Sequence, residues 1–443
     1  MGRRRLLLLP IAILLHNPAA AAQRSAAGER HGLSLDALPA WSRVEQPLSG
    51  ERLEVFIVPH THDDTGWLET VDGYYEESVK WILDTATSAV ERDQRWTPHC
   101  PDPLDPACHK RVFSYVEIDF FEKWWAEQGE GTRNITRKLV AEGRLEFNVA
   151  GWCMNDEASP TYSAAINQMT EGHQFVLREF GPLGRASVGW HVDPFGHSAS
   201  IASLWSGMGF DAFGLERIDW REKDRRKASQ ELEFVWRGSD SLGAETQIFA
   251  HILDSHYNTP PEMAYDGTGG STMRFSKQSA SEQADAFAKM ARTRSSYYRH
   301  NLLMIPYGDD FMHTHAFRSF DDMDDLMNVI NTNPQRYNMT VRYLLHTLNA
   351  ACLSVCLSVS VLHMHCPSRY GGFKDYVHAV NALNLSWPLL DGAHPLANGN
   401  RDFHPYTTNT YNGKADVWSG YYTSRPKLKG MSEVPVRFPF ILQ

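Results

Sequence analysis

The sequence predicts an α/β fold with a mostly parallel sheet. Short apolar runs of strand length alternate along the chain with longer segments in which apolar residues recur every three or four positions. This alternation is typical of strand–helix units. Polar residues also cluster directly after several of the apolar runs, where α/β proteins carry their functional loops. The pattern leaves open whether the sheet closes into a barrel.

The first predicted strand lies in the stretch from Leu53 to Trp67. Its apolar run stops at Pro59 and is followed by two histidines and two aspartates. Residues two positions apart in an extended chain point to the same side, so His62 and Asp64 can converge on one metal ion. These two side chains form half of a zinc site. A polar turn without any metal is the alternative, since such short patterns are common by chance.

Helices and strands alternate through most of the remaining chain. The segment from Tyr74 to Arg92 has apolar residues at the spacing of an amphipathic helix. After it, the predicted elements are a strand at 111–118, a helix at 134–142, a strand at 145–150, a helix at 163–180, a strand at 186–192, a helix at 200–208, strands at 211–215, 232–236 and 247–253, a helix at 279–291 and a strand at 302–306.

Polar residues after these strands are expected to meet. Loops on one rim of the sheet would bring their side chains together. The residues concerned are Asn155, Asp156, Glu157, Asp193, Arg217, Tyr257, Asp309 and Asp310.

The composition fits a globular protein. With 443 residues the chain can form one domain of roughly 300 residues or more and part of another. Its 42% hydrophobic and 12% aromatic content allows a full core and supplies rings that suit sugar stacking. The net charge of −10, with no basic block beyond the first residues, argues against a nucleic-acid partner.

The N-terminal residues predict entry into the secretory pathway. Residues 1–22 combine three arginines, a short apolar run and an alanine-rich cleavage site, as a signal peptide does. Residues 23–50 are patternless and are expected to be a disordered lead-in. We expect no membrane span, because no apolar run reaches about 18 residues. Cys100 and Cys108 bracket a loop that a disulfide could close. Three glycosylation motifs agree with secretion, at Asn134, Asn338 and Asn384.

Four motifs together resemble a known family. They are His60-Thr61-His62-Asp63-Asp64-x-Gly66-Trp67, Gly151-Trp152-x-Met154-Asn155-Asp156-Glu157-Ala158, Trp190-His191-Val192-Asp193-Pro194-Phe195-Gly196-His197 and Gly308-Asp309-Asp310-Phe311. Their order and wording are similar to those of class II α-mannosidases, glycoside hydrolase family 38, and most of all to the lysosomal type. The resemblance extends from Leu53 to Lys429 apart from one interruption. It implies a barrel of seven strand–helix units followed by a helical domain.

The resemblance also implies a zinc ion and two reacting carboxyl groups. The zinc ligands would be His62, Asp64, Asp193 and one further histidine. Asp193 would also be the nucleophile and Asp310 the general acid/base, as a retaining glycosidase requires two carboxyl groups about 5 to 5.5 Å apart. Zinc would grip two hydroxyls of the mannose and help the ring distort, rather than generate hydroxide.

Further residues match positions around the bound mannose, although each has a plainer interpretation. The aromatic ones can belong to the core, the arginine can form a surface ion pair, and the carboxylates can cap turns. Asp309 and Asp310 are adjacent, and the repulsion of two neighbouring carboxylates raises the pKa of one of them, as an acid catalyst needs. The expected substrate-binding residues are Trp67, Phe195, Arg217, Tyr257 and Asp309, and Asp156 is expected to hydrogen-bond behind them.

The sequence departs from the family in two places. The run from Cys352 to Val355 is repeated at once from Cys356 to Val359. Since a TGTC tetranucleotide repeat encodes this run in any frame, we interpret residues 351–370 as a translated intron. The family's fourth zinc ligand lies in a His-His-Asp motif that does not occur here, and nothing around His394 or His404 marks either as a replacement.

The sequence therefore predicts a catalytic domain over 51–350 and 371–416, followed over 417–443 by the start of a truncated helical domain and an unrelated tail. The leading interpretation is a zinc-dependent retaining α-mannosidase of the lysosome, vacuole or extracellular space, acting on mannose-containing oligosaccharides. Two alternatives stay open. One is a catalytically dead, carbohydrate-binding fragment. The other is a zinc-dependent sugar deacetylase, in which zinc would activate water and Asp310 would be dispensable.

Overall fold

The computed structural model describes residues 51–93, 111–264, 275, 279–342, 372–393, 401–409 and 415–425. Several sequence predictions lie outside these residues: the signal peptide, the lead-in, the pairing of Cys100 with Cys108, the intron interpretation, His394 and the tail. Among the described helices, none is long and apolar enough to cross a membrane.

Most described strands pair in parallel, as predicted. One sheet has the order β8-β1-β9, a second has the order β10-β6-β7-β5-β4, and β2 pairs with β3. The antiparallel pairs are β6 with β7 and β11 with β12. The bounds are β1 Leu53–Pro59, β2 Phe113–Tyr115, β3 Leu145–Phe147, β4 Val188–His191, β5 Ala212–Leu215, β6 Glu233–Arg237, β7 Gln247–Ile252, β8 Leu302–Tyr307, β9 Met339–Arg342, β10 Leu389–Leu390, β11 Thr407–Asn409 and β12 Ala415–Val417.

Strand β1 is buried along almost its whole length. It lies between β8 and β9, parallel to both, and Val55 is completely buried. Branched and aromatic side chains suit a strand that is covered on both faces. Because the strand is fixed on both sides, the polar residues after Pro59 leave the sheet at a defined point.

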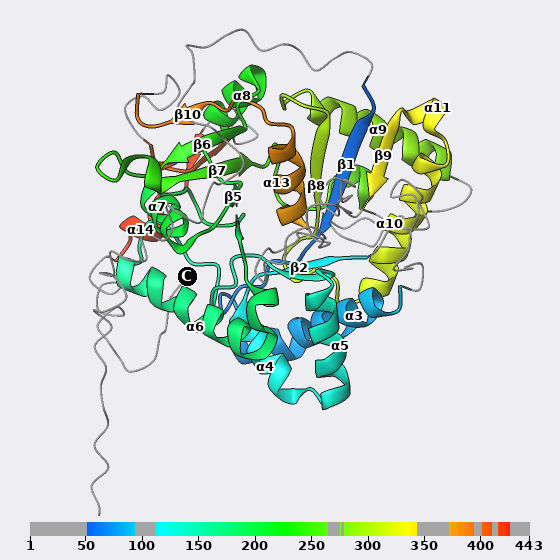
Figure 1. Cartoon of the computed structure of the whole chain (residues 1–443), viewed down its shortest axis with the longest axis horizontal. Helices are drawn as coiled ribbons and strands as arrows, with labels where there is room; N and C mark the ends of the chain where they lie inside the picture. Colours follow the sequence, from blue (N-terminus) through cyan, green and yellow to red (C-terminus); the bar gives the residue numbers. More distant parts are fainter. Residues whose placement is uncertain are drawn as a thin grey trace, which may run out of the picture.

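Helices surround these strands. Two groups of strands stand on either side of α13, which packs against β8 and β5 (Figure 1). The bounds are α2 Val71–Tyr74, a π-helical turn η3 Tyr75–Val79, α3 Lys80–Glu91, α4 Ile118–Glu127, α5 Glu130–Ala141, α6 Tyr162–Phe180, α7 Ala199–Met208, α8 Trp220–Ser229, α9 Ala280–Ser295, α10 Ala316–Asn331, α11 Pro334–Tyr337, α13 Phe373–Ala382, α14 Gly420–Thr423 and the short 3₁₀ turns η5 Gly181–Gly184, η6 Gly243–Thr246 and η7 Pro261–Met263.

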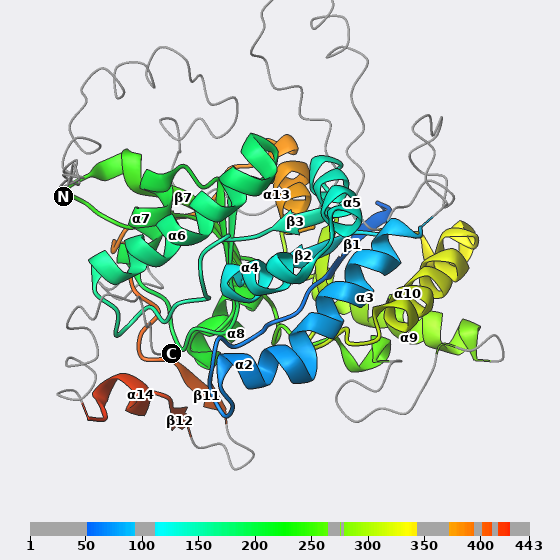
Figure 2. The same ribbon diagram turned by 90° about the horizontal axis from the view of Figure 1, so that it is seen from below.

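Single backbone contacts connect the strand pair β2–β3 to the two larger sheets. A bridge between His60 and Ser114 brings β2 beside β1, and the view from below shows β2 and β3 next to β1 (Figure 2). The amide of Val149, just after β3, donates to the carbonyl of Val188 in β4 at 2.9 Å. The α/β class with parallel strands is confirmed. The strand pairs of the described residues do not close into a barrel, so the seven-unit barrel is not confirmed.

The sequence analysis located most elements but missed several. The predicted strand at 111–118 ends at Tyr115, and helix α4 begins at Ile118. Helix α8 was missed because seven of its ten residues are charged, so it has no apolar stripe to mark it. Helix α10 and strand β9 were also missed. Beyond the predicted catalytic domain, the described residues of 417–443 include the last residue of β12 and the short helix α14.

The contact between β4 and α7 requires a glycine. A Cβ atom at Gly189 would overlap ring carbons of Trp205, a side chain that is 1% exposed. Interiors are packed too densely to absorb an added methyl group without displacement. The position of β4 therefore depends on close approach of this ring to the backbone.

We expect Gly189→Ala to destabilise the protein by about 1–3 kcal/mol, because overpacking forces side chains and backbone to shift. Gly207→Ala in α7 is the matched control. A Cβ there meets no atom within 4 Å, so alanine should stabilise by about 0.5–1 kcal/mol through its helix propensity. Urea unfolding measures both. Equal stability of Gly189→Ala and the wild type would contradict this account of the packing.

Candidate active site

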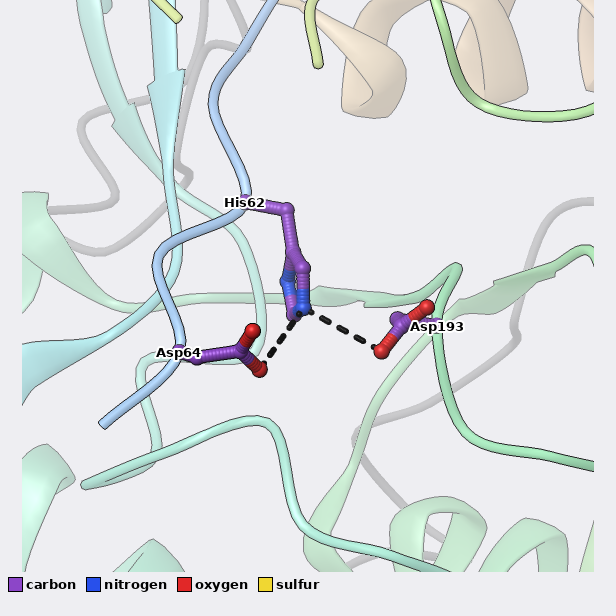
Figure 3. A group of neighbouring side chains, drawn as sticks. All are labelled: His62, Asp64 and Asp193. Atoms are coloured by element: carbon purple, nitrogen blue, oxygen red, sulfur yellow. Dashed lines mark ion pairs between the residues drawn. The ribbon is translucent and has the colours of Figure 1, made fainter. Parts of the chain in front are cut away.

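Three side chains converge between the first and fourth strands. His62 and Asp64 come from the segment after β1, and Asp193 comes from the turn after β4 (Figure 3). The Nε2 atom of His62 lies 3.3 Å from Oδ1 of Asp64 and 3.3 Å from Oδ2 of Asp193. One ligand atom from each residue lies within 4.8 Å of the other two. His62 and Asp64 therefore lie together, and a second carboxylate, that of Asp193, joins them.

The cluster fits a divalent cation. No hydrogen bond satisfies either ring nitrogen of the buried His62. An imidazole and two carboxylates are ligands that zinc takes readily. The side chains of His62, Asp64 and Asp193 are 2%, 11% and 21% exposed, so the cluster opens on the Asp193 side. A ligand of the cation would approach from there.

Glu117 lies behind His62 and was missed by the sequence analysis. Its carboxylate is completely buried, and Oε1 lies 3.5 Å from Nδ1 of His62. Carboxylates behind a ligand histidine orient its ring. Burial alone would lower the pKa of His62, but the carboxylates of Asp193, Asp64 and Glu117 outweigh it and raise that pKa well above 6.5. Glu117 lies two residues after the end of β2. It could therefore have been predicted as a site residue in the same way as the other polar residues that follow strands.

Arg217 holds the other side of Asp193. Its Nε donates to Oδ1 of Asp193 at 3.0 Å, and Nη2 also donates to that oxygen. Burial would raise the pKa of Asp193, but His62 and Arg217 together hold it below its usual range. Asp193 is therefore an ionised carboxylate. Arg217 is 9% exposed, which rules out the surface ion pair that the sequence left open.

Asp310 reaches the cluster through the backbone. The amide of His62 donates to the carbonyl of Asp309 at 3.2 Å, and the amide of Phe311 donates to the carbonyl of His62 at 3.0 Å. The Tyr257 hydroxyl then lies 2.7 Å from Oδ1 of Asp310 and 3.2 Å from Oδ1 of Asp193. Because one hydroxyl reaches both carboxylates, their oxygens lie no farther apart than these two distances added.

Asp309 supports this arrangement from the side. Its Oδ1 accepts from the amide of Asp310 at 2.9 Å and from the side-chain amide of Asn258. Burial, with the charge of Asp310 as a further cause, raises the pKa of Asp309. The sequence predicted such a rise within the Asp309–Asp310 pair, and it falls on Asp309.

Aromatic rings line the same region. Phe195 lies with its ring centre 5.1 Å from the Arg217 guanidinium and 5.1 Å from the ring of Trp418. The Arg217 Nη1 donates to the Tyr406 hydroxyl at 3.3 Å. Trp67 is 66% exposed and so is not a core residue. The sequence analysis missed Tyr406 and Trp418 as neighbours of the site, because neither belongs to a strand-end motif.

Asp156 and His404 lie outside the group formed by His62, Asp64 and Asp193. Asp156 Oδ2 accepts from the amide of Ser159 at 2.8 Å, which fits the turn-capping alternative. His404 packs against Gly196, and among the described residues the metal-ligand group contains only His62, Asp64 and Asp193. The structure therefore gives no support to His404 as a fourth ligand.

Comparison with known proteins gives a consistent result. The family described as glycosyl hydrolases family 38 N-terminal domain matches residues 52–351. The chain is 34% identical over 394 residues to a lysosomal alpha-mannosidase of Dictyostelium discoideum, covering 86% of this chain and 33% of that protein. It is 35% identical over 400 residues to the human lysosomal alpha-mannosidase, covering 87% and 34%. The chain thus spans about a third of the length of the curated relatives it matches.

A solved structure shares the fold. The alpha-mannosidase from Enterococcus faecalis V583 aligns with a TM-score of 0.52 and 16% identity, covering 76% of this chain and 30% of that one. At this identity the likeness concerns the fold alone.

The raised pKa of His62 predicts how cation binding depends on pH. A ligand histidine must be neutral, so binding should release one proton below that pKa, and the affinity for Zn²⁺ should fall about tenfold per pH unit there. Without metal, protonated His62 should stabilise the fold below pH of about 6.5, a contribution lost as pH rises through the raised pKa.

Titration calorimetry at pH 6.5 in two buffers of different ionisation enthalpy measures this release. The number of protons released is the slope of the apparent enthalpy against the ionisation enthalpy of the buffer. The same apparent enthalpy in both buffers for the wild type would show that His62 is already neutral.

Proposed function

Since the chain belongs to glycosyl hydrolase family 38, we propose that it carries the active site of a zinc-dependent retaining α-mannosidase. The proposed substrates are terminal α-mannosyl residues of N-glycans or glycoprotein-derived oligosaccharides. One observation carries the proposal: Asp193 belongs both to the metal-ligand group and to the pair of carboxylates that share the Tyr257 hydroxyl.

Asp193 is the proposed nucleophile. Its lowered pKa keeps it ionised, and the negatively charged carboxylate attacks carbon far better than the protonated carboxyl group does. Asp193 is also the most exposed member of the metal-ligand group, so a sugar can reach it. Attack on the anomeric carbon would break the glycosidic bond as the leaving oxygen takes a proton from Asp310, and would form a covalent glycosyl-enzyme intermediate. Water that gives its proton back to Asp310 would then hydrolyse this intermediate and free Asp193.

Asp310 is the proposed general acid/base. The distances from the Tyr257 hydroxyl limit its separation from Asp193 to a value compatible with the about 5 to 5.5 Å of retaining glycosidases. The hydroxyl has one proton, so it donates to one carboxylate at a time. The shorter distance favours Asp310 as the acceptor of this proton. Once Asp310 is itself protonated, the Tyr257 hydroxyl could donate to Asp193 instead.

His62, Asp64 and Asp193 would hold the zinc ion. Bound there, zinc would supply a Lewis acid that orients two sugar hydroxyls beside the nucleophile. The donor set and the unsatisfied ring nitrogen of His62 support this assignment. Trp67, Phe195, Arg217 and Tyr257 are proposed to contact the sugar, and Asp309 is proposed to orient Asp310 or contact the sugar itself.

We propose that the strands approximate a seven-unit barrel of β1, β2, β3, β4, β5, β7 and β8. The links from β1 to β2 and from β3 to β4 support it. The amide of Thr259, beyond β7, also donates to the carbonyl of Gly308, beyond β8, at 2.7 Å. We further propose a lysosomal location, in keeping with the names of the relatives and with the exposure of Asn134, Asn338 and Asn384.

We expect Asp193→Ala to lower kcat for a nitrophenyl α-mannoside by at least about 1,000-fold, because no group remains to attack the anomeric carbon. Asp310→Ala should lower hydrolysis of an alkyl α-mannoside about 100- to 10,000-fold, with a smaller effect on formation of the glycosyl-enzyme from the nitrophenyl substrate, whose leaving group needs little protonation.

The exposed Asp211 directly precedes β5, at the end of that strand opposite to Arg217, and supplies the control variant Asp211→Ala. Its rates should match those of the wild type. Normal turnover by Asp193→Ala would refute the assigned nucleophile.

Removing the metal should abolish turnover. Dialysis against a chelator is expected to eliminate hydrolysis, and Zn²⁺ but not Mg²⁺ should restore it, since Zn²⁺ binds imidazole readily whereas Mg²⁺ prefers oxygen ligands. Asp64→Asn should weaken Zn²⁺ affinity about 10-fold or more, whereas Asp224→Asn on the exposed face of α8 should not. Hydrolysis at the wild-type rate after complete removal of metal would contradict the assignment of zinc.

A further inference from the structure

Glu157 makes three hydrogen bonds from a fully buried carboxylate. Its Oε1 accepts from Nδ1 of His191 at 2.7 Å and from Nδ1 of His197 at 2.9 Å. Its Oε2 accepts from the backbone amide of Ser198 at 2.8 Å. The side chains of Glu157 and both histidines are 0% exposed. No water is needed to satisfy this carboxylate.

These donors lie on both sides of Asp193. His191 is the last residue of β4 and precedes Asp193 by two positions, whereas His197 and Ser198 follow it and lead into α7. One carboxylate therefore joins the strand before the turn to the helix after it. The turn of residues 192–197, which carries Asp193, cannot open without breaking at least one of these bonds.

The outer side of the turn is held as well. The amide of Phe403 donates to the carbonyl of His197 at 2.8 Å, and Asp402 Oδ1 accepts from the amide of Ala199 at 2.6 Å. Gly196 has φ +95°, and a Cβ there would overlap the ring of His404. The turn thus lies between Glu157 on one side and residues 402–404 on the other.

We propose that Glu157 is a positioning residue that fixes Asp193 at the distance from His62 and from the Tyr257 hydroxyl that the site requires. Glu157 contacts neither His62 nor Asp193 among its hydrogen bonds, so it acts through the turn. The inference rests on the proposed function for its effect on zinc and turnover. Its effect on the turn itself is independent of that function.

Substitution of Glu157 should change the structure mainly in the turn of residues 192–197. Leaving a buried donor unsatisfied costs about 1–3 kcal/mol, and a glutamine can accept from some of the three donors but must point its own N–H₂ at another. The turn would then relax, and the oxygen of Asp193 that lies 3.3 Å from His62 would lose its fixed position. Residues that orient metal ligands typically change affinity about 10- to 100-fold.

Glu233 offers a matched control. It too is a buried carboxylate that accepts from two histidines, from His251 at 2.9 Å and from His300 at 2.7 Å, with the Tyr376 hydroxyl as third donor at 2.8 Å. These partners belong to β7, the segment before β8 and α13, and none is in the metal-ligand group. Glu233→Gln should therefore lose similar stability without disturbing the turn.

The test compares full-length Glu157→Gln and Glu233→Gln. Competition with a chromogenic chelator would measure the Zn²⁺ affinity of each variant. Amide hydrogen exchange in the metal-free protein would measure the opening of residues 192–199. Glu157→Gln should bind Zn²⁺ at least tenfold more weakly and exchange faster in that segment. Glu233→Gln should stay within threefold of the wild type in affinity, with unchanged exchange there.

A second pair of variants covers the case in which Glu157→Gln does not fold. His197→Phe removes one donor, and His197→Asn keeps a side-chain N–H close to the position of Nδ1. Weaker Zn²⁺ binding by the first and rescue by the second support a positioning role, because a loss of general packing would not be rescued by the smaller asparagine.

Two outcomes overturn the inference: wild-type affinity and exchange in Glu157→Gln, or an equal loss in Glu233→Gln. Should the wild-type protein bind no Zn²⁺ and release no mannose, the proposed function fails on its own. The exchange rates of residues 192–199 would then decide the role of Glu157 alone.

Discussion

The site depends on the burial of one imidazole among carboxylates. His62 lies between Asp64, Asp193 and Glu117 at 3.3 to 3.5 Å, almost without access to water. Buried charges of one sign are costly unless a cation compensates them. In the metal-free protein, protonated His62 and Arg217 supply that charge. A divalent cation would take over the role of the proton, so the arrangement that stabilises the fold would also suit a bound cation.

Rigid elements hold these charged groups against their repulsion. β1 is fixed between β8 and β9, which determines where His62 and Asp64 leave the sheet. Backbone hydrogen bonds between His62 and the segment of Asp309 and Phe311 bring the end of β8 to the same point. Asp193 stands on a turn held from two sides. The proposed reacting groups thus lie on strand ends and tight turns, which hold their positions closely.

Family membership and geometry support each other at different levels. The match over residues 52–351 identifies the domain, and the geometry explains why its motif residues occur as they do. Glu157 is an example. It lies in the same motif as Asp156, yet it contacts the turn of Asp193 rather than the metal-ligand group. A motif residue can therefore act by holding a neighbouring segment instead of touching the substrate.

Features that depend on residues close along the chain could be predicted before the structure was known. Apolar periodicity gave the α/β class and most element positions, and the spacing of His62 and Asp64 predicted their convergence, because both depend on residues close along the chain. The motifs added Asp193 and Asp310 through resemblance. Three contacts became apparent only in the folded chain: Glu117 lies behind His62, Tyr257 joins Asp193 to Asp310, and Glu157 holds the turn of residues 192–197. Those contacts join residues far apart in sequence, and no local pattern encodes which strand ends will meet.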